Sequence, residues 1–520
     1  MRNARPASFY RYAQALPQRT AVIESDGRRI TYGELHRQAN RVSHALRASG
    51  VETGAKIAVL ASNNAHFLAL ELGASQIGVR MVAVNTHLAQ DEVTYILGNS
   101  ESRLVFTEES FVHRVRAGLS ALDRSADDLI TIDAPGGPRS LDTFVAGRPE
   151  IEPAHRVHAM RSMYTSGTTG RPKGVVWPVD TSVTPEAGVA ALDWIMEQRG
   201  MRHDPTAVNL ISGPLHHGAP GSWALAGLHR GHTIALSGKW DSEQFLRLVE
   251  EYRVTVAQLA PIHFYRLLQL TSRVRASYDL SSLRIVSHAG SPTPVAVKRQ
   301  MMDWLGPILW EYYGAAEGWG TTISPSDWLE HPGSAGRHDA EGARMKILDD
   351  SGRELPPGEP GTLWVRNPTG VNSEYLGDPE RTAANRRGEY FTVGDIAYLD
   401  AEGWLYIVDR RTDLILSGAV NVYPAEVEDA LRRHPAVADV AVIGMPDPEW
   451  HQRVHAVVVP APGVAPTAAL VDELRAFVGG RLARFKVPKQ IEFRAALPYS
   501  QAGKLLRREL REQAGRPDGR

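Results

Sequence analysis

The chain contains no cysteine, which excludes disulfide bridges, thiolate nucleophiles and cysteine-ligated zinc. It also has no excess of either charge, because 58 basic and 59 acidic side chains leave a formal net charge of −1. No general attraction to nucleic acid or to anionic membranes follows from that balance. No stretch approaches the roughly 18–20 apolar residues of a membrane span, and the first residues have no apolar core of signal-peptide length. We therefore expect a cytoplasmic protein.

The chain is long enough for two or more domains: it has 520 residues, of which 43% are hydrophobic and 22% charged, as in ordinary globular proteins. The segment "ITYGELHRQANRVSHALRASG" predicts a helix, since Thr31 and Glu34 form a capping box and Gly50 follows the last apolar position. Short apolar strands at 56–62 and 80–85 flank a second apolar helix. Strand–helix alternation of this kind indicates an α/β sheet.

The character of the sequence changes twice towards its end. From about Glu341, apolar runs are separated by Asp, Gly and Pro turns, which predicts hairpins. After Asp409, a short polar stretch precedes a helix, two strands and another helix, together the size of an independent domain. The predicted fold class is α/β. A large N-terminal α/β domain of several subdomains is expected at 1–409, a hinge at 410–413, a small mobile α+β domain at 414–510, and a tail at 511–520.

The stretch "MYTSGTTGRPKGVV", residues 163–176, is typical of loops that hold phosphate, because small residues let backbone N–H groups approach an anion closely. It is not the common P-loop. Gly167 and Lys173 have the spacing of that motif, but Pro172 replaces its second glycine and Gly174 replaces its Mg²⁺-binding Ser or Thr. The sequence therefore predicts a phosphate site of another kind, with one lysine at the end of the loop.

Further motifs follow this loop in a fixed order. They are "SGPLHHGAPG", "LRIVSHAGSPTP", "EYYGAAEG", "YFTVGDIAYLD", "IVDRRTDLILSGAVNVYPAEVE" and "LPYSQAGKLLRREL". Together with the loop, they resemble the acyl-adenylate-forming superfamily, which comprises acyl-CoA synthetases, the adenylation domains of peptide synthetases and beetle luciferases. The resemblance runs from about Thr20 to Leu510, so it covers nearly the whole chain.

The resemblance implies an ATP site assembled from several of these motifs. Tyr313 is expected to cover one face of the adenine, and Asp395 to accept hydrogen bonds from both ribose hydroxyls, which suits an acceptor-only carboxylate. The residues expected to bind ATP are Thr165, Ser166, Gly167, Thr168, Thr169 and Lys173 for the phosphates, and Gly290, Ser291, Pro292, Tyr313, Gly314, Asp395 and Arg410 for the adenosine part.

The resemblance also implies the catalytic groups. Lys504 is expected to be the adenylation lysine, and Glu317 to ligate Mg²⁺, which prefers carboxylate oxygens. Thr165 is expected to act from the phosphate loop. His217 is expected to gate the passage between the thiol and the acyl carbon; its neighbour His216 leaves a histidine metal pair as an alternative, for which the sequence offers no further ligands.

Two positions depart from the family pattern. Ala316 stands where the family has a threonine whose hydroxyl contacts the α-phosphate and the adenylate. Thr412 stands at the predicted hinge, where Asp or Lys is usual. A hinge need only absorb changes in φ and ψ, so threonine is compatible with that role.

The acyl-binding residues are predicted from the same motifs. His217, Trp223, His288 and Gly318 are the candidates, and a structural role for His288 is the alternative. Small residues at both walls, Ala219 and Gly221 on one and Gly318 and Gly320 on the other, predict a roomy apolar pocket. The segment after His217 has no Asp to hold an amine, as amino-acid adenylation domains do, so an α-amino acid is not the expected substrate.

The implied reaction has two half-reactions. A carboxylate, which we expect to be fatty, aryl or polycyclic, attacks the α-phosphorus of ATP and gives acyl-AMP and pyrophosphate, with Mg²⁺ as cofactor. The thiol of coenzyme A then expels AMP. Three alternatives stay open: a ligase that loads a carrier protein, a luciferase-like oxygenase acting on an acyl-adenylate, and a catalytically inactive homologue that binds ligand. The sequence does not specify the acid or the oligomeric state.

Overall fold

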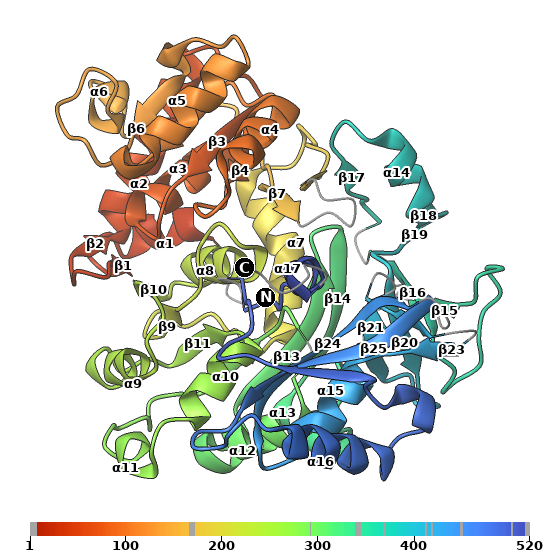
Figure 1. The fold of residues 1–520 in the computed structure, drawn as a ribbon. Helices are drawn as coiled ribbons and strands as arrows, with labels where there is room; N and C mark the ends of the chain where they lie inside the picture. The colour runs from red at the N-terminus through yellow and green to blue at the C-terminus, as the bar shows by residue number, and fades with distance from the viewer. Residues whose placement is uncertain are drawn as a thin grey trace.

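A seven-stranded sheet carries the predicted phosphate loop at one edge (Figure 1). The computed structural model describes residues 8–165, 172–291, 293–337, 345–367, 370–410, 413–417, 420–447, 451–500 and 503–514. The sheet order is β17 (Glu374–Tyr375), β8 (Lys173–Val176), β7 (Ser162–Thr165), β4 (Arg80–Ala83), β3 (Lys56–Leu60), β5 (Leu104–Thr107) and β6 (Leu129–Thr131). Neighbours are parallel from β7 to β6, whereas β8 and β17 add antiparallel.

A second sheet has eight strands and, like the first, combines parallel and antiparallel neighbours. Its order is β14 (Gly318–Ile323), β13 (Leu309–Ala315), β12 (Ile285–His288), β11 (Val256–Leu259), β9 (Val208–Ile211), β10 (Thr233–Leu236), β1 (Thr20–Ile23) and β2 (Arg29–Thr31). The six inner strands are parallel, and antiparallel hairpins close both edges. Strand β14 therefore turns back over β13, which brings the "EYYGAAEG" motif to a sheet edge.

Helices connect most of these parallel strands, as the alternating sequence pattern predicts. In the predicted helix at 31–50, Thr31 and Glu34 form the expected capping box, and Thr184 caps the later helix that begins at Pro185. Their bounds are α1 (Phe9–Ala15), α2 (Tyr32–Ala48), α3 (Ala65–Ser75), α4 (Gln90–Ser100), η1 (Glu109–Phe111), α5 (Val112–Ala121), η2 (Ala126–Asp128), α6 (Leu141–Val145), α7 (Pro185–Gln198), α8 (Gly218–His229), α9 (Ser242–Glu251), α10 (Pro261–Leu268), α11 (Ser272–Arg275), α12 (Val295–Leu305) and α13 (Pro325–Glu330). Within the described ranges, none of these or the later helices combines the length and apolarity needed to cross a bilayer.

The hairpins predicted after Glu341 form a third sheet. It consists of β18 (Arg386–Arg387), β19 (Tyr390–Phe391), β16 (Gly361–Arg366), β20 (Asp395–Leu399) and β21 (Leu405–Arg410), with β15 (Met345–Leu348) also pairing with β16. All these pairings are antiparallel. Helix α14 (Pro379–Ala384) lies between β17 and β18 in the chain, so this sheet is connected directly to the edge that holds β8.

The C-terminal sheet has its own apolar core, built from residues such as Val427, Val442 and Leu474. Its strands are β23 (Val420–Val422), β22 (Ile415–Ser417), β25 (His451–Pro460), β24 (Val437–Asp447) and β26 (Gln490–Phe493), with α15 (Pro424–Arg432), α16 (Ala468–Gly479), η3 (Arg484–Lys486) and α17 (Arg507–Ala514). Such a separate core is what the size and composition of this segment predict.

The final helix differs from the predicted tail at 511–520, because α17 continues to Ala514. Leu510 on this helix is fully buried, and Arg511 forms an ion pair of 2.6 Å with Asp413. These contacts stabilise the first four residues of the segment that composition alone classed as a tail.

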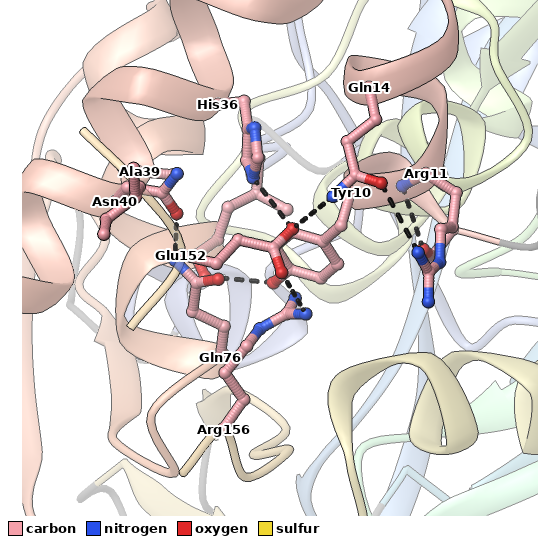
Figure 2. A network of polar contacts seen from close by, with 12 residues as sticks. Tyr10, Arg11, Gln14, His36, Ala39, Asn40, Gln76, Glu152 and Arg156 are labelled. Carbon is pink, nitrogen blue, oxygen red and sulfur yellow. Dashed lines mark hydrogen bonds and ion pairs between the residues drawn. The ribbon is translucent and has the colours of Figure 1, made fainter. Parts of the chain in front are cut away.

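A polar network fixes the chain segment that enters β7 (Figure 2). Glu152 accepts hydrogen bonds from Gln14 of α1 and Arg156, at 3.1 and 2.9 Å, and its carboxylate lies 3.3 Å from His36 of α2. The Arg156 guanidinium lies 4.2 Å from the centroid of the Tyr10 ring. The segment before the phosphate loop is thus anchored to two helices.

Arg161, one residue before β7, is a second anchor. Its guanidinium forms a buried bidentate pair with Glu71 of α3, with a Nε–Oε1 distance of 2.6 Å, and donates to the carbonyl of Leu215 at 2.8 Å. Charges removed from water are tolerated when they are paired and fully hydrogen-bonded in this way. The pair therefore joins the phosphate-loop strand to α3 and to the turn before α8.

We predict that Glu71→Gln or Arg161→Met alone destabilises the protein by about 3–5 kcal/mol, because each leaves an unpaired buried charge. The double variant Glu71→Leu/Arg161→Met is expected to regain most of that loss, since neither charge remains. Urea denaturation followed by circular dichroism measures the difference. Single variants within about 1 kcal/mol of the parent protein would contradict a buried charge pair here.

Candidate active site

The phosphate loop is held between two paired strands. Thr165 ends β7 and Lys173 begins β8, and these two residues are direct cross-strand partners. A side chain at Gly174 would come within 2.8 Å of the Tyr164 ring, so glycine is required there by packing. The loop residues predicted to bind phosphate, Ser166, Gly167, Thr168 and Thr169, lie outside the described part of the chain.

Lys173 and Glu317 come together through a residue that the sequence motifs do not include. The Tyr375 hydroxyl donates to Glu317 Oε1 at 2.7 Å, and Lys173 Nζ lies 5.2 Å from the centroid of the Tyr375 ring. Ser373 donates to the Glu317 carbonyl at 2.8 Å. Burial, and then the carboxylate of Glu317, raise the pKa of Tyr375, so the phenol stays protonated as a donor.

The positioning of Tyr375 follows from strand pairing. β17 adds antiparallel to β8, with Tyr375 opposite Val175. Glu317 lies in the turn between β13 and β14 of the other large sheet, and its side chain is buried. Figure 1 shows β17 in teal beside the yellow strands of the phosphate-loop edge. The carboxylate and the loop lysine are thus brought together from different sheets.

The residues predicted to bind the ribose are also neighbours. Tyr313 in β13 donates from its hydroxyl to Asp395 Oδ2 at 2.7 Å, and Asp395 is the first residue of β20. Asp395 and Arg410 are cross-strand partners in the third sheet. Nothing is described of the Arg410 side chain, but its backbone position is adjacent to the carboxylate. The predicted hinge residue Thr412, two positions further on, lies outside the described residues.

The turn after β12 contains a glycine with positive φ and open space beside its Cα. Gly290 has a φ of +99°, and no atom lies within 4 Å of the position that a Cβ would take. An L-residue is strained at this φ, which explains the glycine. Ser291 follows it, and Pro292 lies outside the described residues.

His288 at the end of β12 is buried among side chains of the fold. It is fully buried, its Nδ1 lies 3.2 Å from Thr293 Oγ1, and its Nε2 lies 3.6 Å from Glu311. Glu311 in turn accepts a 2.7 Å hydrogen bond from the buried Lys298. These contacts favour the structural alternative, and a substrate role for His288 stays a prediction.

Lys504 acts electrostatically on His217, one of the histidine pair at the start of α8. His217 is the N-cap residue of that helix, and its ring centroid is 4.5 Å from that of His216. Burial, and then the charge of Lys504, lower the pKa of His217 to about 4, so the ring is neutral near pH 7. The predicted gating residue and the predicted adenylation lysine are therefore close enough to interact.

The turn that presents Lys504 rests on the N-terminal part of the fold. Gly503 has a φ of +73°, and a Cβ there would lie 2.5 Å from Ile262 of α10 and 3.1 Å from Ala260. The turn is closed by a 2.8 Å hydrogen bond from the Ser500 N–H to the Lys504 carbonyl. Any side chain at position 503 would push the lysine away from α10.

Glycine is required at the positions predicted to widen an acyl pocket because other side chains fill the space that a Cβ would take. The Cβ direction of Gly318 is filled by Asn367 and Phe391, and that of Gly221 by Arg161. Both are packing glycines, so the inference of a roomy pocket from their small size is not supported. Trp223, on α8, is fully buried and stacks on Tyr312 with ring centroids 6.0 Å apart and an interplanar angle of 4°.

The substitution at Ala316 leaves its backbone in a defined contact. Trp177, just after β8, donates from Nε1 to the Ala316 carbonyl at 3.2 Å. Gly314, two residues earlier, pairs with Trp319 across the β13–β14 hairpin. No described contact replaces the hydroxyl of the family's threonine.

Tyr375, Ser373 and Trp177 were missed by the sequence analysis. Each of the three makes its contact with a residue far away in the sequence. Tyr375 stands in a short polar segment, but this does not distinguish it from the other tyrosines of the chain. Their roles become visible only when the strand pairing is known.

Glu317 is suited to hold Mg²⁺ together with a nucleotide. Within the described ranges, no three His, Asp or Glu side chains are grouped to enclose a cation by themselves. Mg²⁺ at ATP sites takes one or two carboxylates and completes its shell with phosphate oxygens and water. A single carboxylate, oriented by Tyr375 and close to Lys173, fits that requirement.

The comparisons with known proteins agree with this geometry. Residues 9–376 match the AMP-binding enzyme family and residues 426–504 match the AMP-binding enzyme C-terminal domain. The chain belongs to the AMP-binding enzyme family, which confirms the resemblance seen in the sequence. The mixed α/β fold, with a large N-terminal part and a small C-terminal part, is that of adenylate-forming enzymes.

Two curated relatives align over nearly their full length. The chain is 34% identical over 508 residues to the fatty acid–[acyl-carrier-protein] ligase ScoC of Streptomyces coeruleorubidus, covering 96% of this chain and 95% of that protein. It is 34% identical over 523 residues to a feruloyl-CoA synthase of an Amycolatopsis species, covering 99% and 100%.

A solved structure supports the fold independently. The o-succinylbenzoate CoA synthetase (MenE) of Bacillus subtilis, in complex with its acyl-adenylate intermediate OSB-AMP, superimposes with a TM-score of 0.81 at 29% identity. The superposition covers 99% of both chains.

We predict that Tyr375→Phe lowers acid-dependent pyrophosphate release roughly 10- to 100-fold, the value of one hydrogen bond to a charged group. The ring stays beside Lys173, so the loss isolates the hydroxyl. The Mg²⁺ concentration for half-maximal activity should rise, because Glu317 is no longer oriented.

The matched control is Tyr278→Phe, which removes a 2.8 Å tyrosine–glutamate hydrogen bond to Glu243 on the surface. It should leave both activity and Mg²⁺ dependence unchanged. An unchanged Mg²⁺ dependence in Tyr375→Phe would contradict the positioning role.

Proposed function

We propose that this protein is an ATP-dependent carboxylate–CoA ligase. It joins an acid to ATP to give acyl-AMP and pyrophosphate, and then transfers the acyl group to the thiol of coenzyme A with release of AMP. The observation that carries the proposal is the turn of Lys504, which packs against α10 through Gly503 and whose charge acts on His217.

The first half-reaction needs positioning and charge neutralisation rather than covalent help from the protein. Lys173 is placed to neutralise the departing pyrophosphate at the end of the phosphate loop. Lys504 stabilises the negative charge that builds up where carboxylate and α-phosphate meet. Mg²⁺ on Glu317, when bound, supplies further stabilisation of phosphate charge. In this proposal, the residues that the sequence predicts to bind the phosphates, the adenosine and Mg²⁺ perform those functions.

The second half-reaction requires that the small domain move. In the conformation described, the turn of Lys504 packs against α10 through Gly503. The domain of residues 414–510 therefore rotates about the hinge at 410–413, with Thr412 at its centre. That rotation withdraws Lys504 and admits the thiol past His217.

The relatives include enzymes named for each of the two candidate thiols, coenzyme A and a carrier protein. The feruloyl-CoA synthase is named for a coenzyme A product, whereas ScoC is named for an acyl-carrier-protein acceptor. Coenzyme A is our choice, and a carrier protein is the second candidate. Supplying each thiol in turn to the acyl-adenylate distinguishes them, because only the true acceptor forms a thioester at an appreciable rate.

The acid is one with a substantial apolar body. Tyr312, which is partly buried and stacks on the buried Trp223, offers aromatic surface on the α8 side of β13. Pyrophosphate release measured across fatty, aromatic and polycyclic acids tests this assignment, and no release with any acid would contradict the proposed function. The cysteine-free composition supports a cytoplasmic location.

We predict that Lys504→Ala lowers acyl-AMP formation by at least about 100-fold, as expected for removing a group that stabilises transition-state charge. Conversion of supplied acyl-AMP to thioester should fall much less, because Lys504 is withdrawn in that step. Pyrophosphate release and thioester formation are measured separately.

Lys346→Ala serves as control, because Lys346 is an exposed lysine paired with Glu354 at 3.2 Å in the third sheet. Both half-reactions should be unaffected in that variant. Equal losses in the two half-reactions of Lys504→Ala would show that the lysine does not act in adenylation alone.

A further inference from the structure

Arg199 is a buried cation without a carboxylate partner among the described residues. It follows the last residue of α7, and only 7% of its surface is exposed. Its Nε is fully enclosed and has no hydrogen-bond partner in the part of the chain that the structure describes. Burial lowers the pKa of Arg199, and Tyr312 is the ionisable neighbour among the described residues that opposes this effect.

The other buried arginines of this region are paired. Arg230 forms an ion pair of 2.5 Å with Asp193, which also binds His203 at 3.0 Å. Asp193 lies on α7 itself, nearly two turns before Arg199, yet its carboxylate is committed to those partners. Unpaired buried charge is costly and is seldom retained without a ligand or a partner.

The location of Arg199 is set by packing against β13. A side chain at Gly200 would lie 2.8 Å from Trp310, and the Arg199 guanidinium lies 4.0 Å from the centroid of the Tyr312 ring. Side chains alternate along a strand, so Trp310 and Tyr312 share one face while Tyr313 faces the other. Arg199 therefore lies beside Tyr312, on the opposite face of β13 from Tyr313 and its partner Asp395.

The same face connects to the reactive end of the site through α8. Tyr312 stacks on Trp223, and Trp223 follows the N-cap residue His217 by six residues. Six residues of helix span about 9 Å. His217 thus stands at one end of this region, and Trp223 lies about 9 Å further along the helix, with Tyr312 and then Arg199 beside it.

We propose that the acid activated by this protein carries a second carboxylate at its far end, which binds the Arg199 guanidinium, while Tyr312, packed on the buried Trp223, contacts the apolar atoms between the two carboxylates. The planar fork of arginine matches a carboxylate in a bidentate arrangement. This inference rests on the proposed function, and it replaces a purely apolar acid by one that is apolar along its body and anionic at both ends.

The opposing interpretation is purely structural. Arg199 contacts an aromatic ring and lies at a helix C-terminus, and both are favourable places for a cation. In that case the guanidinium would stabilise the fold and would not discriminate between acids. Substrate preference therefore decides between the two interpretations, whereas a stability measurement alone does not.

The experiment compares α,ω-dicarboxylic acids of roughly six to ten carbons, which bracket the ~9 Å span, with monocarboxylic acids of equal length. The readout is kcat/KM for acid-dependent pyrophosphate release. We expect the full-length protein to prefer the best dicarboxylic acid by about 100-fold or more, since a buried polar group rejects a ligand that leaves it unpaired.

Arg199→Met keeps an apolar stem beside Tyr312 and removes the charge. It should abolish that preference, mainly through KM for the dicarboxylic acid, while the monocarboxylic acid is used as well as before or better. Arg199→Lys should retain part of the preference, because it keeps the charge but loses the fork. The matched control is Arg202→Met, an exposed arginine three residues away, which should leave the preference intact.

Two failures are distinguishable. No pyrophosphate release with any acid would overturn the proposed function itself. Release with monocarboxylic and dicarboxylic acids at equal kcat/KM, or a preference that Arg199→Met does not change, would overturn the role of Arg199 and leave the ligase assignment intact. The substrate series on the unmodified protein tests the proposal even if Arg199→Met does not fold.

Discussion

The hydrogen bond from Tyr375 to Glu317 is the contact on which the arrangement of the active site depends. Glu317 belongs to the β13–β14 turn of the eight-stranded sheet, whereas Tyr375 belongs to β17 at the edge of the seven-stranded sheet. The bond fixes the distance between these edges. It also fixes the carboxylate relative to Lys173. Lys173 is the first residue of β8, the strand that follows the phosphate loop and pairs with β17. Charge stabilisation at a triphosphate requires groups held in advance of the reaction, and here a single phenol holds two of them.

The remaining groups reach the same place from other parts of the fold. Asp395 begins β20 and is bonded to Tyr313, so the third sheet joins the eight-stranded sheet at the adenosine side. Lys504 arrives on a turn whose glycine lies against α10. The contacts of Glu317 and Asp395 are hydrogen bonds between side chains, whereas that of the Lys504 turn is a close packing contact. A site that must open for a second substrate is suited by this division, in which side-chain hydrogen bonds hold the fixed groups and the turn of Lys504 packs against α10 through a glycine.

The sequence predicts those features that are encoded locally. The capping box of Thr31 and Glu34 depends on residues a few positions apart, and the structure has it as expected. Tyr375 and Arg199 could not be found in that way, because their significance depends on which strand is beside which. Gly221 and Gly318 were interpreted as pocket walls because a glycine in sequence does not reveal what fills its missing side chain; Arg161, Asn367 and Phe391 do so.

The contrast between Arg161 and Arg199 shows how a structure separates architecture from recognition. Both arginines are about nine-tenths buried. Arg161 is bonded to both oxygens of Glu71 and to a backbone carbonyl, so its hydrogen-bonding capacity is used by the fold. Arg199 has an aromatic neighbour, and among the described residues no carboxylate binds it. The fold therefore satisfies one of these cations by itself and leaves the other for a group that arrives from outside, and the natural place for such a group is the far end of the acid.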